Sequence, residues 1–372
     1  MSAMTYVIHL PSIEMMARIS DPTFPHMAFF HEEGRWHMSS CNRYVQVRIP
    51  TDLRAPSNDG LGFTVPAQKF SDVLHVLETP EVTLQLKGHQ VEVKSGKSRF
   101  SLPQGDLEGF PLMSESPSAW TAHMPARDLR RKFTKLLPAV AKDPLSPLSG
   151  ICLEIVPGSE QIGKAFATDG LRLHQVDWTE TEPLETLDPS SEIQRVVLPG
   201  EAVKQIMALI NGNAGCLQMF GNQTMMRFMQ DDFILQTVLM DAGEYPSVQR
   251  LTQRLAKSEP WFQTNRAGLQ RLIERGMLAA GPDQIARLET ANDLLQVSTT
   301  NLLTQEGFTG SQAVTCCTVQ QKQCYNLASL QDALKPVSTT HVAIQRPGGS
   351  SGALQIQDAE DQFVAVLQNW KE

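Results

Sequence analysis

The feature that most constrains the fold of this chain is an internal repeat of strand–helix units. Three stretches share a short strand, a helix start and then apolar residues at helical spacing. The stretches are FTVPAQKFSDVLHVLETPEVTLQL (63–86), VVLPGEAVKQIMALINGNAGCLQM (196–219) and CYNLASLQDALKPVSTTHVAIQ (324–345). In each copy two apolar residues four positions apart share a helical face: Phe70 and Leu74, Val203 and Met207, and Leu330 and Leu334.

The residues at the start of these helices fit the same interpretation. Pro66 and Pro199 suit a helix start, where a missing backbone N–H costs nothing. Asn326 takes the place of a capping residue in the third copy. The alternating sequence VTLQLKGHQVEVKS predicts antiparallel strands joined by a turn after the first helix.

A second, related strand–helix unit also recurs three times. Its copies are YVIHLPSIEMMARIS (6–20), WTAHMPARDLRRKFTKLL (120–137) and WFQTNRAGLQRLIERGML (261–278), and the pattern Asp-Pro-x-x-Pro follows the first two. The chain therefore reads as six half-units in three pairs, with a period far longer than that of a solenoid. This predicts three similar α+β domains, at 1–117, 118–253 and 254–372. The alternative is three unrelated domains that happen to share strand–helix units.

Composition restricts the class of protein. The 372 residues are 41% hydrophobic and 19% charged, which is typical of a globular protein. No stretch approaches the roughly 20 apolar residues of a membrane span, and the N-terminus lacks the basic region of a signal peptide. The six cysteines form no metal-binding spacing, so we expect reduced thiols in a cytoplasmic protein that has no membrane partner.

Signs of an active site are absent from the sequence. SGKS (95–98) resembles the end of a phosphate-binding loop, but the glycine required five positions before Gly96 is Val91. His26, His31 and His37 would share a metal ion only by accident of folding. The carboxylates at 358, 360 and 361 are interpreted as a solvated turn rather than an acid–base pair. We therefore expect no catalytic residue, metal or cofactor.

A net charge of −8 argues against nucleic acid unless the cations are gathered on one face. On a helix from Pro125 to about Lys142, the cations Arg127, Arg131 and Lys135 fall opposite the apolar face formed by Leu129, Phe133, Leu136 and Val140. The corresponding helix of the third domain carries Arg266, Arg271 and Arg275. An ordinary solvated face is the alternative to a surface that meets phosphates without reading bases.

Three segments carry a resemblance to a known family. They are FTVPAQKFSDVLHVL with VEVKSGKSRFSLPQGDLEGFP (63–111), FATDGLRL (166–173) and GEYPSVQRL (243–251). The first resembles the end of the first domain of the bacterial DNA polymerase III beta subunit, the beta sliding clamp. The second resembles that family's ATDGHRL motif, and the third its G-[RK]-[FY]-P signature. Their order and spacing agree over essentially the whole chain.

The resemblance implies a fold, an assembly and a function. Two three-domain chains of this family form a ring-shaped head-to-tail homodimer, with helices lining the hole and sheets outside. Such a ring encircles double-stranded DNA without sequence specificity and acts as a non-catalytic processivity factor for the replicative DNA polymerase. The resemblance places Phe100 and Leu102 on one side of the dimer interface and Met277 and Leu278 on the other, although all four could be ordinary core.

The family also has an apolar cleft that receives short motifs from polymerases, the clamp loader and other proteins. An apolar groove with a few orienting polar groups suits an extended peptide. For Arg172, a structural salt bridge is as good an interpretation as contact with the peptide. Carried across by motif, the cleft comprises Leu148, Thr168, Gly170, Leu171, Arg172, Leu173, Pro246, Arg250 and Leu251, with Leu367 and Trp370 from the C-terminal tail.

Several residues depart from the family pattern. Leu171 replaces a histidine, Asp21 stands where some members carry a DNA-contacting arginine, and the chain ends FVAVLQNWKE where the family usually ends in a Met-Pro-Met-Arg-like tail. These changes leave the fold intact and put in question which motif the cleft accepts. The alternative function is therefore an interaction scaffold, or an accessory clamp of a phage, mobile element or paralogue, with altered partner choice.

Overall fold

The computed structural model describes residues 4–7, 9–54, 62–79, 81–113, 118, 120–155, 161–179, 185–186, 194–210, 215–247, 257–315, 321–346, 352–358 and 363–370. The chain folds into two compact units. Unit 1 comprises Met1–Arg127, Leu184–Pro189 and Glu201–Leu239, and unit 2 comprises Asp128–Pro183, Ser190–Gly200 and Met240–Glu372. Each unit therefore combines segments that are distant in the sequence.

Unit 1 contains two antiparallel sheets. The smaller sheet has the order β5 (Leu53–Arg54), β1 (Met4–Val7), β7 (Glu81–Lys87), β8 (Gln90–Ser95) and β9 (Ser98–Pro103). The larger has the order β14 (Glu185–Thr186), β10 (Trp120–Pro125), β16 (Cys216–Gly221), β17 (Met225–Gln230), β18 (Phe233–Val238), β4 (Val45–Pro50), β3 (Arg35–Cys41), β2 (His26–Glu32) and β6 (Gly62–Pro66). The helices are α1 (Leu10–Ile19), α2 (Ala67–His75) and most of α4 (Gly200–Leu209).

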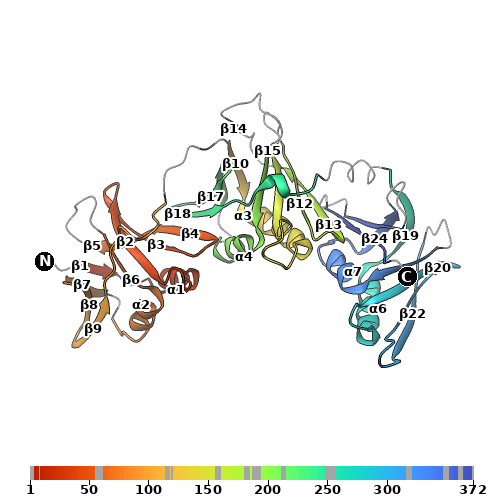
Figure 1. Ribbon diagram of the computed structural model, residues 1–372, viewed down its shortest axis with the longest axis horizontal. Helices are drawn as coiled ribbons and strands as arrows, with labels where there is room; N and C mark the ends of the chain where they lie inside the picture. The colour runs from red at the N-terminus through yellow and green to blue at the C-terminus, as the bar shows by residue number, and fades with distance from the viewer. Residues whose placement is uncertain are drawn as a thin grey trace. The chain divides into compact units, whose positions relative to one another are not determined.

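An aromatic core holds the first part of unit 1 together. Helices α1 and α2 lie side by side in Figure 1. Phe70 of α2 and Tyr6 of β1 pack on Phe29, whose ring is stacked on Phe63 at 5.1 Å between centroids. All four side chains are buried, and aromatic pairs at such distances add stability beyond the area that they bury.

Unit 2 also contains a larger and a smaller antiparallel sheet. Its larger sheet has the order β15 (Gln194–Pro199), β11 (Gly150–Ile155), β12 (Gln161–Thr168), β13 (Arg172–Thr179), β26 (Phe363–Leu367), β25 (Leu354–Asp358), β24 (His341–Arg346) and β19 (Glu259–Asn265). Its smaller sheet has the order β22 (Gly307–Ala313), β21 (Leu294–Thr300), β20 (Ile285–Ala291) and β23 (Gln321–Asn326). The helices are α6 (Arg266–Ala279), α7 (Leu327–Leu334), most of α3 (Ala126–Leu136), and the short 3-10 turns η1 (Leu137–Ala139) and η2 (Ala242–Glu244).

The six predicted strand–helix half-units are all present. Each of the six α-helices among the described residues directly or closely follows a strand, as in β1–α1 and β23–α7. The side chain of Asn326 caps α7 by accepting from the amide of Ser329 at 2.8 Å, and Asn265 caps α6 in the same way. The predicted hairpin after α2 is β7–β8, paired from Thr83 with Lys94 to Lys87 with Gln90. The α+β class and the repeat are therefore confirmed.

One helix is shorter than predicted. The sequence pattern extended the helix after Pro125 to about Lys142, whereas α3 ends at Leu136 and a 3-10 turn follows over Leu137–Ala139. Pro138 explains the difference, because it lacks an amide hydrogen and disfavours the helical conformation of the residue before it. Val140, predicted on the apolar face of the helix, lies beyond this turn in extended backbone.

The large sheets join strands from different repeats. Strand β18 pairs with β4 from Ile234 opposite Arg48 to Thr237 opposite Val45, and β13 pairs with β26 from Arg172 opposite Leu367 to Val176 opposite Phe363. The three-domain boundaries at 117 and 253 remain a prediction about the repeats, since the compact units group the strands in this different way. Within the described ranges, no helix has the length and apolar character needed to cross a membrane.

Candidate functional site

The turn between β12 and β13 is built by the side chains of its own sequence, Thr168-Asp169-Gly170-Leu171-Arg172. Asp169 accepts hydrogen bonds from the amides of Leu171 and Arg172, each at 3.0 Å. Thr168 accepts from the amide of Gly170 at 3.1 Å and donates to the carbonyl oxygen of Arg172 at 2.6 Å. Gly170 has φ +90°, a conformation that a residue with a side chain rarely adopts. The turn is therefore fixed, and it holds Leu171 at its tip.

Arg172 ties this turn to helix α7. Its guanidinium binds Asp169 at 3.0 Å and Asp332 of α7 at 2.9 Å, and only 9% of its side chain is exposed. Burial alone would raise the pKa of Asp332, but hydrogen bonds from Lys335 and Arg172 outweigh that effect and lower this pKa. Of the two interpretations of Arg172 open at the level of sequence, the structure shows the salt bridge.

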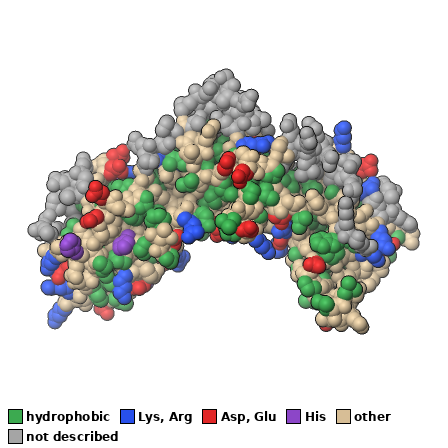
Figure 2. Space-filling model, viewed as in Figure 1, with side chains coloured by type: hydrophobic (Ala, Val, Ile, Leu, Met, Phe, Trp, Pro, Cys, Tyr) green, Lys and Arg blue, Asp and Glu red, His purple; other side chains and the backbone are tan. Residues whose placement is uncertain are grey.

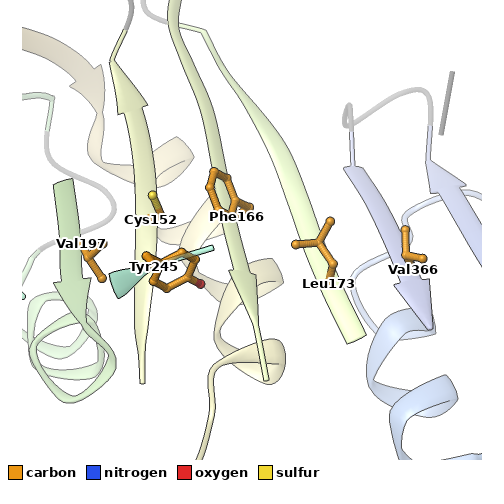
Figure 3. Packing of buried hydrophobic residues seen from close by; sticks show 6 residues of the cluster. All are labelled: Cys152, Phe166, Leu173, Val197, Tyr245 and Val366. Carbon is orange, nitrogen blue, oxygen red and sulfur yellow. The ribbon is translucent and has the colours of Figure 1, made fainter. Parts of the chain in front are cut away.

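Tyr245 holds the η2 segment against the same sheet. Its hydroxyl accepts from the amide of Thr168 and donates to the carbonyl oxygen of Gly150, both at 3.2 Å. Burial raises the pKa of this phenol above its usual range, so the hydroxyl stays protonated and can donate. Figure 3 shows the Tyr245 ring close to Phe166, edge to face at 5.6 Å, in a buried cluster with Cys152, Leu173, Val197 and Val366.

A partly exposed apolar surface lies over this cluster. Leu171 is 61% exposed, Pro246 is exposed, and Leu148 is partly buried against the cluster. A Cβ atom at Gly170 would lie 3.9 Å from the Leu148 side chain, so Leu148 adjoins the turn. Met240, Ala242 and Val364 pack against the same cluster. We call Leu148, Leu171, Pro246, Met240 and Ala242 the apolar patch; Arg250 and Leu251 lie outside the described residues.

Comparisons with known proteins show which family the chain resembles. A family model described as the DNA polymerase III beta subunit, N-terminal domain, matches residues 20–114. The chain is 27% identical to the beta sliding clamp of Salmonella typhimurium over 90% of this chain and 88% of that protein. It is 26% identical to the beta sliding clamp of Escherichia coli over 82% and 80%. The chain is therefore similar, over most of its length, to proteins of the beta sliding clamp family.

Solved structures show that this chain has the fold of sliding clamps over its whole length. The DNA polymerase III subunit beta of Pseudomonas aeruginosa matches with a TM-score of 0.88 at 20% identity, over 100% of both chains. A Pseudomonas aeruginosa clamp bound to griselimycin matches at 0.86 with 20% identity, again over 100% of both chains. The DNA polymerase sliding clamp of Bacillus subtilis matches at 0.84 with 15% identity, over 100% of this chain and 99% of that one.

The cations predicted on α3 divide into two groups. Arg127 is exposed, and Arg131 is exposed and bonded to Asp128 at 3.2 Å. The predicted outward position of Lys135 is wrong, since this residue is only 5% exposed and its ammonium lies 5.5 Å from the centre of the Phe363 ring. A helical projection places only the Cβ atom, and the long lysine stem can lie along apolar surface.

The cations of α6 divide in the same way. Arg271 and Arg275 are exposed, whereas Arg266 is partly buried at the first position of the helix and donates to the carbonyl oxygen of Val337. Figure 2 shows lysine and arginine side chains at several places on the visible face, with carboxylates nearby.

The C-terminal strand places the two predicted tail residues differently. Leu367 is 2% exposed and pairs with Arg172 across β13 and β26, so its side chain belongs to the core rather than to a surface that a peptide can reach. Trp370 is 47% exposed, and its amide donates to the carbonyl oxygen of Cys324 at 2.7 Å. Leu173 and Thr168 are buried beneath the turn, so they support the patch from below.

The four residues predicted at the dimer interface also differ in exposure. Leu278 is 86% exposed, and Phe100 and Met277 are partly exposed. Leu102 is only 4% exposed and pairs with Val91 inside its own sheet. Three of the four side chains are therefore at least partly exposed, whereas Leu102 belongs to the core of unit 1.

Two acidic residues have roles that the sequence pattern did not indicate. Asp332 lies 160 positions from Arg172, and no local motif marks their contact. Asp358, interpreted from the sequence as part of a solvated turn, is 1% exposed and accepts from the amide and hydroxyl of Ser338, while 360 and 361 lie outside the described residues. No group of His, Cys, Asp and Glu among the described residues is arranged to hold a metal ion.

Proposed function

We propose that this chain is a DNA polymerase processivity factor, a sliding clamp that encircles duplex DNA without reading its sequence. The family and the fold over the whole chain carry this proposal. As a member of a non-catalytic family, the chain is not an enzyme. The clamp tethers a replicative polymerase, a clamp loader and other proteins that carry a short clamp-binding motif.

The ring requires two copies of the chain, joined head to tail. Strand β9 ends the smaller sheet of unit 1, and β22 ends the smaller sheet of unit 2. They have similar lengths, six and seven residues, and each presents one row of backbone groups that no described strand pairs. Pairing β9 of one copy with β22 of a second satisfies both rows, and two such contacts close a ring. Phe100, Met277 and Leu278 supply apolar surface beside these edges.

Contact with DNA is electrostatic. The exposed cations Arg127, Arg131, Arg271 and Arg275 meet backbone phosphates, which carry no sequence information. Such contact weakens steeply with salt, because each neutralised phosphate releases counterions. Retention on DNA at high salt must then come from the closed ring rather than from these contacts.

The apolar patch receives the partner's motif. It offers the exposed Leu171 side chain, on a turn that internal hydrogen bonds and the Arg172 salt bridges hold rigid, and the exposed Pro246, next to the anchored Tyr245. A preorganised surface of this kind binds a short extended segment at a low cost in conformational entropy.

The test combines oligomeric state with topology. Native mass spectrometry should give twice the mass of the chain. After loading by a bacterial clamp loader and ATP on a nicked circular plasmid, the protein should stay with the DNA at high salt. Cutting the plasmid once with a restriction enzyme should release it, since a ring slides off an end. A monomer at micromolar concentration, or equal retention on circular and linear DNA, would contradict the proposal.

A further inference from the structure

The apolar patch has an acidic margin that its neighbours do not neutralise. Asp241 caps the 3-10 turn η2 and Glu244 is its last residue, and both side chains are exposed. Glu244 directly precedes Tyr245, whose hydroxyl bonds to the turn that carries Leu171. Within the described part of the chain, neither carboxylate forms a salt bridge; Asp241 accepts only the amide of Gly243, at 2.8 Å.

The cations near the patch are already engaged. Arg172 is bound between Asp169 and Asp332, and Lys335 also binds Asp332, at 3.0 Å. Arg195, which donates to Ser247 next to Pro246, is paired with Glu154 at 3.0 Å. These two groups are each neutral overall.

One more pair of opposite charges lies beside the patch. Lys142 and Asp143 are exposed neighbours in the segment between Ala141 and Leu148. The amide of Ala141 donates a hydrogen bond to the carbonyl oxygen of Leu148 at 3.1 Å, which joins the two ends of this segment. Their opposite charges cancel in the net charge of this segment. The described charge that remains beside the patch is therefore that of Asp241 and Glu244.

From this arrangement we infer that the apolar patch selects a peptide in which a lysine or arginine adjoins the apolar anchor residues. This inference rests on the proposed function and specifies the partner of the same site. The leucines and Pro246 accept the anchors, and the carboxylates of Glu244 and Asp241 attract the cation. An acidic residue at that position of the peptide would meet two carboxylates and no free cation of the described patch, so it is disfavoured.

The test uses three nine-residue peptides that share two leucines and one phenylalanine and carry lysine, glutamine or glutamate beside these anchors. Binding is measured with the full chain by fluorescence anisotropy at low and high salt. We expect the lysine peptide to bind about three- to ten-fold more tightly than the glutamate peptide at low salt, with the glutamine peptide between them. The difference should shrink at high salt because exposed charges are screened.

Two variants and a control separate the charge from the apolar contact. Glu244→Lys should abolish or reverse the order of the peptides, whereas Leu171→Gln should weaken all three without changing their order. Glu78→Lys, at an exposed position of unit 1 with no described salt bridge, should change neither. Equal affinity of the lysine and glutamate peptides, or an order unchanged in Glu244→Lys, would overturn the inference while leaving a peptide site in place. Failure of all three peptides to bind, with equal loss of the protein from circular and linear DNA, would overturn the proposed function as well.

Discussion

Replacing Tyr245 by phenylalanine tests how the patch is held in place. The variant keeps the ring that packs on Phe166 and removes a hydroxyl that serves both Thr168 and Gly150. Tyr245 is 3% exposed, so water does not easily replace the lost partner. Each hydrogen bond contributes about 1 kcal/mol net, and the buried groups left unpaired add to the loss. We therefore expect the free energy of local opening of the segment around Tyr245 to be about 2 kcal/mol lower than in the native protein.

Hydrogen exchange measures this change at the site itself. The amide of Thr168 donates to the removed hydroxyl, and 2 kcal/mol corresponds to exchange about 30-fold faster at this position. Tyr325→Phe is the matched control in the same unit, since its hydroxyl donates to Gly352 at 2.7 Å and has no bond to the turn. It should lower the stability of unit 2 by about 1 kcal/mol without changing exchange at Thr168. Unchanged exchange at Thr168 in Tyr245→Phe would refute the reasoning.

Three further outcomes are expected. Burial lowers the pKa of His174 to about 4, despite its hydrogen bond to the carbonyl of Lys135, so the unfolded chain binds more protons than the folded chain between about pH 4 and 6.5. The stability from neutral His174 is therefore complete above pH 6.5 and falls by up to about 3 kcal/mol toward pH 4, and thermal unfolding of His174→Gln should lack this loss. Phe166→Ala should destabilise unit 2 by about 3–5 kcal/mol in urea unfolding, whereas Leu171→Gln should change it by less than about 0.5 kcal/mol. Arg271→Gln should reduce the salt dependence of DNA binding by about one phosphate contact in titrations at several salt concentrations, and Lys135→Met should leave that slope unchanged.

Local sequence patterns predicted the helices and strands of this chain well. Phe70, Leu74, Leu330 and Leu334 are all buried as the helical spacing required, and Asn326 caps its helix. These features depend on neighbours within a few residues along the chain. The same holds for the turn at 168–172, where Thr168 and Asp169 bond to backbone groups two to four positions away.

Long-range partners could not be predicted in this way. Nothing near Arg172 indicates Asp332, and nothing near Val45 indicates pairing with Thr237. Lys135 shows a related limit, because a helical projection gives the direction of a side chain but not the aromatic ring from the end of the chain that receives it. The site was therefore predicted by motif, whereas its rigidity and its charge follow only from the fold.

The pairing of β4 with β18 has a consequence for how the chain is made. Thr237 donates to the carbonyl oxygen of Tyr44, 193 positions earlier. At ribosomal speeds of about 5–20 residues per second, the edge of β4 waits about 10–40 s for its partner strand. During this time the first repeat displays an unpaired strand, which is a template for aggregation. During this interval, protection by a chaperone or pairing of the exposed strand with another chain determines how much folded protein is obtained.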